Sequence, residues 1–398
     1  MLHKRLLQQT LGAGLLGAMS VAGLAYAAGQ VSATDRTAAE ACIALGDDAR
    51  IAQCMQQIAP DPPEQQRADA VLDDPATQAA METWSRAYGS AMAAHAQALA
   101  QRGDVRSLLG AMMVMPVQDA PTGDAPGVLG SQARGWFARA RQLGPTDPLV
   151  AWVEVTDCHV LGCDRDAAIA RLLQVDGDNA AARLWANGVA MESGDLRAAR
   201  EHLHAAAVAP RYQSPTGEFL SLLLDARAGA PVPAMDARTS AGMQAATGTG
   251  TAADWMAMQA LGQWAAIALA PMQGVSRFCG PGQAELARDP GLRADCVALL
   301  SRLAADDSTL PYAEMATRLL IGLEPGLTGQ WMPRLRQLAW WREQSLPLLA
   351  GLGGTPGTGQ YARWVASDGE LGAMAKLLHR AGIAAAPPAD WQLPRQPR

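Results

Sequence analysis

Four segments of the chain carry one repeated pattern, in which small and bulky apolar residues recur at helical spacing. These segments are residues 103–116, 131–148, 163–179 and 194–210. In the last three, the recurring residues are Ala133/Phe137/Ala140, Ala168/Leu172/Val175 and Ala199/Leu203/Ala206. Apolar residues three or four positions apart lie on one face of an α-helix, and alternating β-branched runs are sparse. The pattern predicts an all-α fold of helix pairs, because a pair with one apolar stripe must stack on another to bury it.

The composition agrees with a packed helical protein. Of the 398 residues, 49% are hydrophobic and 18% are charged, which opposes disorder. Ala and Leu supply much of the apolar mass, and they are the strongest helix formers. The net charge of −6 argues against non-specific binding to nucleic acid. We therefore expect no nucleic-acid partner.

The last of the four segments resembles the second helix of a tetratricopeptide repeat. Gly194-Asp195, Ala199 and Ala206 fit the pattern of that family, and Pro210 falls one position early. Trp152 fits the aromatic residue near the start of the first helix. The resemblance is degenerate, covers about residues 76–225, and implies stacked antiparallel helix pairs with a concave groove that binds peptides or proteins. A helical bundle with accidental periodicity is the alternative.

Changes in composition divide the chain into six predicted parts. We expect a signal peptide (1–27), a cysteine-clipped helical hairpin with a linker (28–75), the repeat array (76–227), a Pro/Gly/Thr-rich connector (228–251), a C-terminal helical domain (252–385) and an extended tail (386–398). Within the C-terminal domain, helices are expected at 253–271, 283–305, 311–323, 331–351 and 359–381. The chain is thus predicted to be a degenerate tetratricopeptide-like solenoid followed by a second helical domain.

The first 27 residues have the order of a secretory signal peptide. His3, Lys4 and Arg5 precede an apolar stretch over 11–24, and Ala25-Tyr26-Ala27 is a small-x-small cleavage signal. The apolar stretch is short for a membrane span, which needs about 20 residues. We expect a cleaved, periplasmic or secreted protein without a membrane partner. The alternative is a protein anchored in the inner membrane by an uncleaved N-terminus.

The six cysteines form three close pairs, and an even count in an exported chain favours disulfides. The candidate pairs are Cys42/Cys54, Cys158/Cys163 and Cys279/Cys296. Six cysteines allow 15 connectivities, which sequence alone cannot distinguish. Pairing between neighbours is favoured because each pair flanks a helix breaker.

The stretch DCHVLGCDRD (157–166) contains the middle pair and leaves three readings open. Gly162 can break the helix so that Cys158 and Cys163 approach each other as a disulfide requires. A zinc site built on these residues and His159 would need a further ligand. The spacing is not the CxxC of thioredoxin-type redox motifs. A structural disulfide, free thiols, and a metal or redox site are the three readings.

No residue is assigned a catalytic, cofactor-binding or metal-binding role. Residues 248–253 match GxGxxG/A by letter, but no predicted strand precedes them. Residues 354–359 have phosphate-loop glycine spacing without the following Lys. His202 and His204 lie two positions apart and point to different sides of a helix. Glu192-Ser193 has the letters of lysozyme-like lytic enzymes but lies between two repeat helices.

We therefore predict a protein or peptide interaction scaffold in the bacterial envelope. The alternative is a hydrolase of the cell-wall lytic type with an unrecognised site in the C-terminal half, where Glu314, Glu343 and Glu370 supply carboxylates. A third reading is a spacer or assembly piece. A buried carboxylate in a C-terminal cleft would favour the hydrolase, and a long open groove without perturbed acids would favour the scaffold. For Trp340-Trp341 we expect one ring inward and one near the surface, where packing and binding are both possible roles.

Overall fold

The computed structural model describes residues 63–115, 130–267, 271–350 and 357–394. These residues form helices and connecting turns, with no strand among them and one β-bridge between Asn179 and Arg211. The predicted all-α class is confirmed. The predicted signal peptide and the hairpin around Cys42 and Cys54 lie outside the described residues. No helix within the described ranges is long and apolar enough to cross a membrane.

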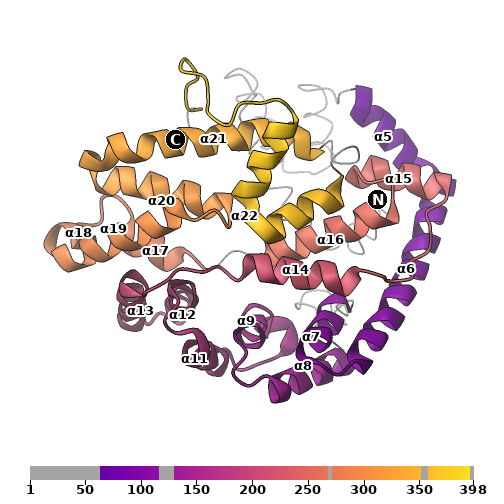
Figure 1. Cartoon of the computed structure of the whole chain (residues 1–398), viewed down its shortest axis with the longest axis horizontal. Coiled ribbons are helices and arrows are strands. Elements are labelled where there is room, and N and C mark those ends of the chain that lie inside the picture. The colour runs from indigo at the N-terminus through magenta and orange to yellow at the C-terminus, as the bar shows by residue number, and fades with distance from the viewer. Residues whose placement is uncertain (1–62, 116–129, 268–270, 351–356, 395–398) are drawn as a thin grey trace, which may run out of the picture.

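The helices of the first half form an arc (Figure 1). In chain order they are α5 (Pro63–Asp73), α6 (Pro75–Gln101), α7 (Val105–Val114), α8 (Ser131–Leu143), α9 (Pro148–Thr156), α10 (Cys158–Leu161), α11 (Arg165–Asp176), α12 (Ala180–Glu192) and α13 (Leu196–Val208).

The helices of the second half lie on the inner side of this arc (Figure 1). They are α14 (Thr216–Arg227), α15 (Ala237–Thr247), α16 (Ala252–Ile267), α17 (Gln273–Cys279), α18 (Ala284–Arg288), α19 (Pro290–Ala305), α20 (Leu310–Leu323), the 3₁₀ turn η1 (Pro325–Leu327), α21 (Thr328–Ala350) and α22 (Thr358–Arg380).

Aspartate caps begin many of these helices. The side chains of Asp74, Asp147 and Asp289 each accept a hydrogen bond from a main-chain N–H of the first turn. Each is followed by a proline at the first helical position, where the missing N–H costs nothing. Short sequence signals therefore set the starts of α6, α9 and α19.

The four segments with the repeated pattern coincide with α7, α8, α11 and α13, and the predicted faces are the buried ones. Eight of the nine recurring residues are buried, and Val175 is half-buried against the main core. α9 packs against α11, and α12 packs along α13. Paired helices with buried small residues are thus present, while their membership of the tetratricopeptide architecture remains a prediction.

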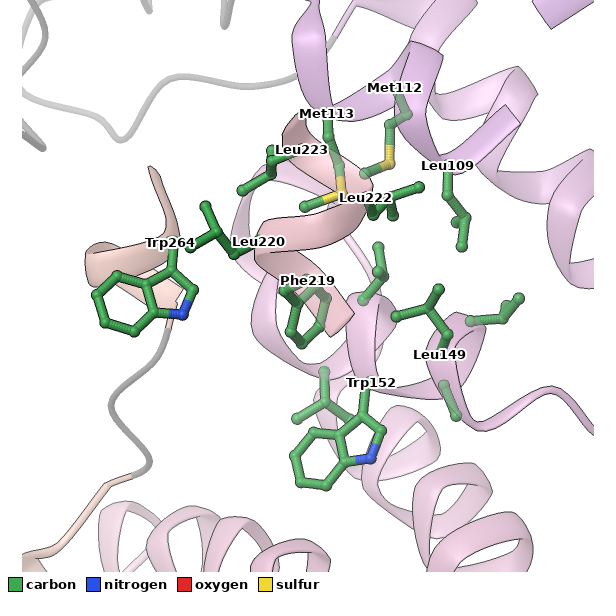
Figure 2. Close-up of a cluster of buried hydrophobic side chains, with 14 of the residues drawn as sticks. Leu109, Met112, Met113, Leu149, Trp152, Phe219, Leu220, Leu222, Leu223 and Trp264 are labelled. Atoms are coloured by element: carbon green, nitrogen blue, oxygen red, sulfur yellow. The ribbon is translucent and has the colours of Figure 1, made fainter. Parts of the chain in front are cut away.

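Helix α14 lies on the inner side of the arc (Figure 1) and packs against α7 and α6. Its Phe219 and Leu220 are buried in one cluster with Trp152 of α9 (Figure 2). The same cluster includes Trp264 of α16 and Trp364 of α22, and α22 packs on both α14 and α16. One core therefore runs from the predicted array into the predicted C-terminal domain. The concave groove implied by the resemblance is occupied at this place by the chain itself.

The predicted connector 228–251 is not irregular throughout, because it contains helix α15. Asp236 caps the start of α15, and Gly248, at φ +72°, ends it. α15 packs on α6, where an added Cβ at Gly242 would collide with Met81. The Pro/Gly/Thr content obscured a helix that is bounded by its own cap residues.

Helix α22 bends at Gly369, where it meets the start of α20. Gly369 has φ +74° and ψ 170° inside the helix. The N–H groups of Glu370 and Leu371 donate to the carbonyl oxygens of Ser308 and Asp307, both at 3.1 Å. An added Cβ at Gly369 would clash with the Asp307 carbonyl. This close approach of two backbones fixes α20 and α22 beneath α21, which contacts both.

Candidate functional site

Two cysteine pairs lie at disulfide distance, as the sequence predicts. The Cα atoms of Cys158 and Cys163 are 5.1 Å apart, and those of Cys279 and Cys296 are 5.5 Å apart. Gly162, at φ +67°, supplies the turn between the first two. The pair Cys42/Cys54 lies outside the described residues. Within the DCHVLGCDRD stretch, the Cys158–Cys163 pair joins α10 to the residue just before the cap of α11. Among the described residues, no three His, Cys, Asp or Glu side chains are grouped to hold a metal ion.

Burial raises the pKa of three described carboxyl groups, those of Asp157, Asp306 and Glu370. Burial raises the pKa of Asp157 to about 7, and burial also raises the pKa of Glu370 to about 7. Glu370 accepts a hydrogen bond of 2.7 Å from the N–H of Leu310, at the start of α20, where Thr309 provides no side-chain cap. Glu370 is thus a helix cap supplied by another helix.

Neither of two hollows on the described surface is lined by Asp157, Asp306 or Glu370. The first hollow, of about 460 Å³, lies between α13 and α19. Its charged groups are already paired: Arg200 binds Asp289, and His204 Nδ1 lies 2.9 Å from Asp295 Oδ2. Glu192, whose Glu-Ser sequence resembles that of lysozyme-like lytic enzymes, likewise forms an ion pair with Arg165. These residues hold helices together.

The second hollow, of about 400 Å³, lies between α21 and a segment that follows α22. It is lined by Pro333, Arg334, Arg336, Gln337, Ala386 and Pro387. Residues 383–394, here called the docked segment, form no helix and are hydrogen-bonded to side chains of α21. This contact differs from helix packing, because it joins a helix to an irregular peptide.

The two indole rings of α21 bind the start of the docked segment. Trp340 Nε1 donates to the Ala384 carbonyl oxygen at 2.9 Å, and Trp341 Nε1 donates to the Ala385 carbonyl oxygen at 2.7 Å. Trp341 is 8% exposed and packs in the cluster between α20, α21 and α22, while Trp340 is half-exposed. The expectation of one inward ring and one ring near the surface is confirmed.

Arg336 binds the middle of the docked segment, one helical turn before Trp340. A guanidinium nitrogen of Arg336 donates to the carbonyl oxygens of Pro388 at 3.1 Å and Ala389 at 3.5 Å. Its Cζ lies 5.6 Å from the ring centroid of Trp391. Trp391 in turn meets Trp340 edge to face, with ring centroids 5.7 Å apart. Such edge contacts and cation–π contacts are attractive.

The residues that bind the docked segment share one face of α21. Pro333, Arg336, Gln337 and Trp340 have the spacing i, i+3, i+4 and i+7, so they lie on one face of the helix. The sequence showed the tryptophans and the proline-rich tail separately. It gave no signal that the two meet, because 44 residues separate each indole from its acceptor.

Comparisons with known proteins found no family model, no curated protein and no solved structure that matches this chain.

Proposed function

We propose that this protein is an exported α-helical scaffold that binds a peptide segment of a protein partner in the bacterial envelope, on the α21 face formed by Pro333, Arg336, Gln337 and Trp340. The observation that carries the proposal is the docked segment. Three side chains of α21 hold a non-helical peptide by four hydrogen bonds and one aromatic contact. Aromatic residues and arginine are also the residue types enriched where proteins bind partners.

The rest of the molecule supports this role in two ways. The two cysteine pairs are compatible with an extracellular or periplasmic location, where disulfides persist. The helix pairs of the arc are proposed here as a degenerate tetratricopeptide-like array, and α21 packs on α20 and α22. Because α14 lies on the inner side of the arc, the proposal places binding on α21 rather than in the groove that the resemblance implies.

The hydrolase alternative receives no support from the described residues. A general acid needs a raised pKa and also access to substrate. Burial raises the pKa of Asp157, Asp306 and Glu370, but none of the three lines either of the two hollows described above.

In vivo photo-crosslinking tests the proposed function. A photoreactive amino acid at Gln337, which lines the α21 hollow, should yield a defined adduct with an envelope protein. The matched control is Leu143, which is 47% exposed at the end of α8. The adduct should disappear when Trp340→Ala is added. The same adducts from both positions, or none from Gln337, would show that α21 is not the binding face.

A further inference from the structure

We infer that the α21 face recognises a proline-containing, non-helical peptide with an aromatic residue about three positions after the proline, and that the docked segment is the internal competitor of that peptide. The inference rests on the proposed function and adds to it the chemistry of the partner. It also adds the means by which access to the face is regulated.

The donors on α21 select main-chain carbonyl oxygens. An indole N–H and an arginine guanidinium can donate hydrogen bonds but cannot accept them. All four hydrogen bonds from α21 to the docked segment end on carbonyl oxygens, those of Ala384, Ala385, Pro388 and Ala389. A helical peptide has its carbonyl groups bonded internally except in the last turn. The face therefore suits a peptide that is not helical.

Prolines fit this face because α21 accepts no hydrogen bond from a main-chain N–H of the docked segment. Pro387 and Pro388 have no N–H to leave unpaired, and their fixed φ keeps the peptide out of a helix at little cost in entropy. The main-chain N–H of Trp391 donates a hydrogen bond within the docked segment, to the carbonyl oxygen of Pro388 at 3.1 Å. That turn brings the indole back onto α21.

Two side chains of α21 contact the aromatic ring of the docked segment. Trp391 lies edge to face with Trp340, and the Arg336 guanidinium lies over its ring. Because Trp391 is only three residues after Pro388, one turn sets the distance between the carbonyl contacts and the ring. A peptide without an aromatic residue at this spacing loses both ring contacts.

The docked segment is exposed enough to be displaced. No residue between 384 and 394 is buried. Most of them are exposed, among them Ala384, Ala385, Ala386, Pro388, Ala389 and Asp390. Only Ile383, at its start, packs against the cluster under α21. A short tether gives such a segment an effective concentration of about millimolar. A free peptide therefore competes poorly until the segment is weakened.

A binding assay with the full-length protein tests the inference. The probe is a fluorescent peptide with the sequence of residues 383–394, IAAAPPADWQLP, followed by anisotropy. Trp391→Ala, which weakens the internal copy, should bind the probe at least tenfold more tightly than the unaltered protein. Adding Trp340→Ala to Trp391→Ala should abolish that binding. Adding Glu343→Gln, on an exposed part of α21 that does not touch the segment, should leave it unchanged.

Three results would overturn the inference. In the first, a Trp391→Ala protein of normal helical content does not bind the probe. In the second, this protein still binds the probe after Trp340→Ala is added. In the third, it binds a probe in which Trp391 is replaced by Ala as tightly as the original probe. If Trp391→Ala fails to fold, Trp391→Leu keeps an apolar side chain and removes the aromatic contacts. If the probe does not bind but the photoreactive residue at Gln337 gives its specific adduct, the inference is wrong and the proposed function is still supported. If the probe binds but no adduct forms at Gln337, the proposed function is wrong.

Discussion

Burial of the Glu370 carboxyl makes the stability of the fold depend on pH. Burial raises the pKa of this carboxyl from 4.5 to about 7, although the hydrogen bond from Leu310 acts in the opposite direction. The folded protein therefore holds this proton more tightly than the unfolded chain does. The resulting stability is fully present below about pH 4.5 and is lost as the pH rises through 7. Asp157 acts in the same direction.

Glu370→Gln should stabilise the protein at alkaline pH. The amide keeps an oxygen for the Leu310 N–H but carries no charge to desolvate. We expect the free energy of unfolding at pH 8 to rise by on the order of 1–3 kcal/mol over the unaltered protein, and the difference to shrink toward pH 4.5. Urea unfolding at both pH values measures it. A difference that is the same at both pH values would contradict the assignment.

At the residue scale, the sequence predicted which side chains are buried better than it predicted their hydrogen-bond partners. The alternation of inward and outward rings at Trp340 and Trp341 follows from helical geometry, since adjacent residues point about 100° apart. The acceptors of their N–H groups depend on how residues 384–385 return to α21, which is a tertiary event. The same holds for Glu370, whose role as a cap for α20 depends on a contact with Leu310, 60 residues away.

At the scale of helices, the bend of α22 depends on Gly369. Gly369→Ala places a Cβ against the Asp307 carbonyl at a positive φ. We expect a loss of about 1–3 kcal/mol in the free energy of unfolding, seen as a lower thermal midpoint. Gly103→Ala has the same sign of φ but open space, so it measures backbone strain alone. Gly89→Ala, in helix α6 with open space, should be neutral or stabilising. Equal effects at all three positions would contradict this account.

The two cysteine pairs should contribute unequally to stability. Cys279 and Cys296 are fully buried, join α17 to α19, and are 17 residues apart, against 5 residues for Cys158 and Cys163. Constraining the longer loop removes more entropy from the unfolded chain, roughly 3 kcal/mol against roughly 2 kcal/mol. The double variant Cys279→Ala/Cys296→Ala should therefore lower the guanidinium midpoint more than Cys158→Ala/Cys163→Ala. The reverse order would show that local strain, not loop length, decides the effect.

The whole molecule should lose structure in both halves when its shared core is damaged. Phe219 of α14 is 1% exposed and lies in one cluster with Trp152 and Trp364. We expect Phe219→Ala to cost about 3–5 kcal/mol, and to speed hydrogen exchange in both α9 and α22. Val208→Ala, at a site that is 62% exposed, is the control. Faster exchange confined to residues 76–227 would mean that the halves fold independently.

At this scale the sequence predicted the elements but not their assembly. Expected helices at 311–323 and 359–381 match α20 (Leu310–Leu323) and α22 (Thr358–Arg380) closely, because periodicity and breakers are local signals. α14 was not assigned to the inner side of the arc, because its apolar face is satisfied by helices from both ends of the chain. The α21 face was missed because the residues that bind its indole groups lie 44 positions further along the chain.

The position of α14 on the inner side of the arc also limits the insertion of further helix pairs. Repeat proteins commonly grow by duplicating a unit, since each unit touches only its neighbours. Here Phe219 and Leu220 touch the arc from inside, and α22 backs α14. An extra helix pair would widen the arc away from a helix of fixed size and leave a void at its centre. We therefore expect an inserted helix pair in the arc to lower the stability of this protein, in contrast to a repeat protein whose units touch only their neighbours.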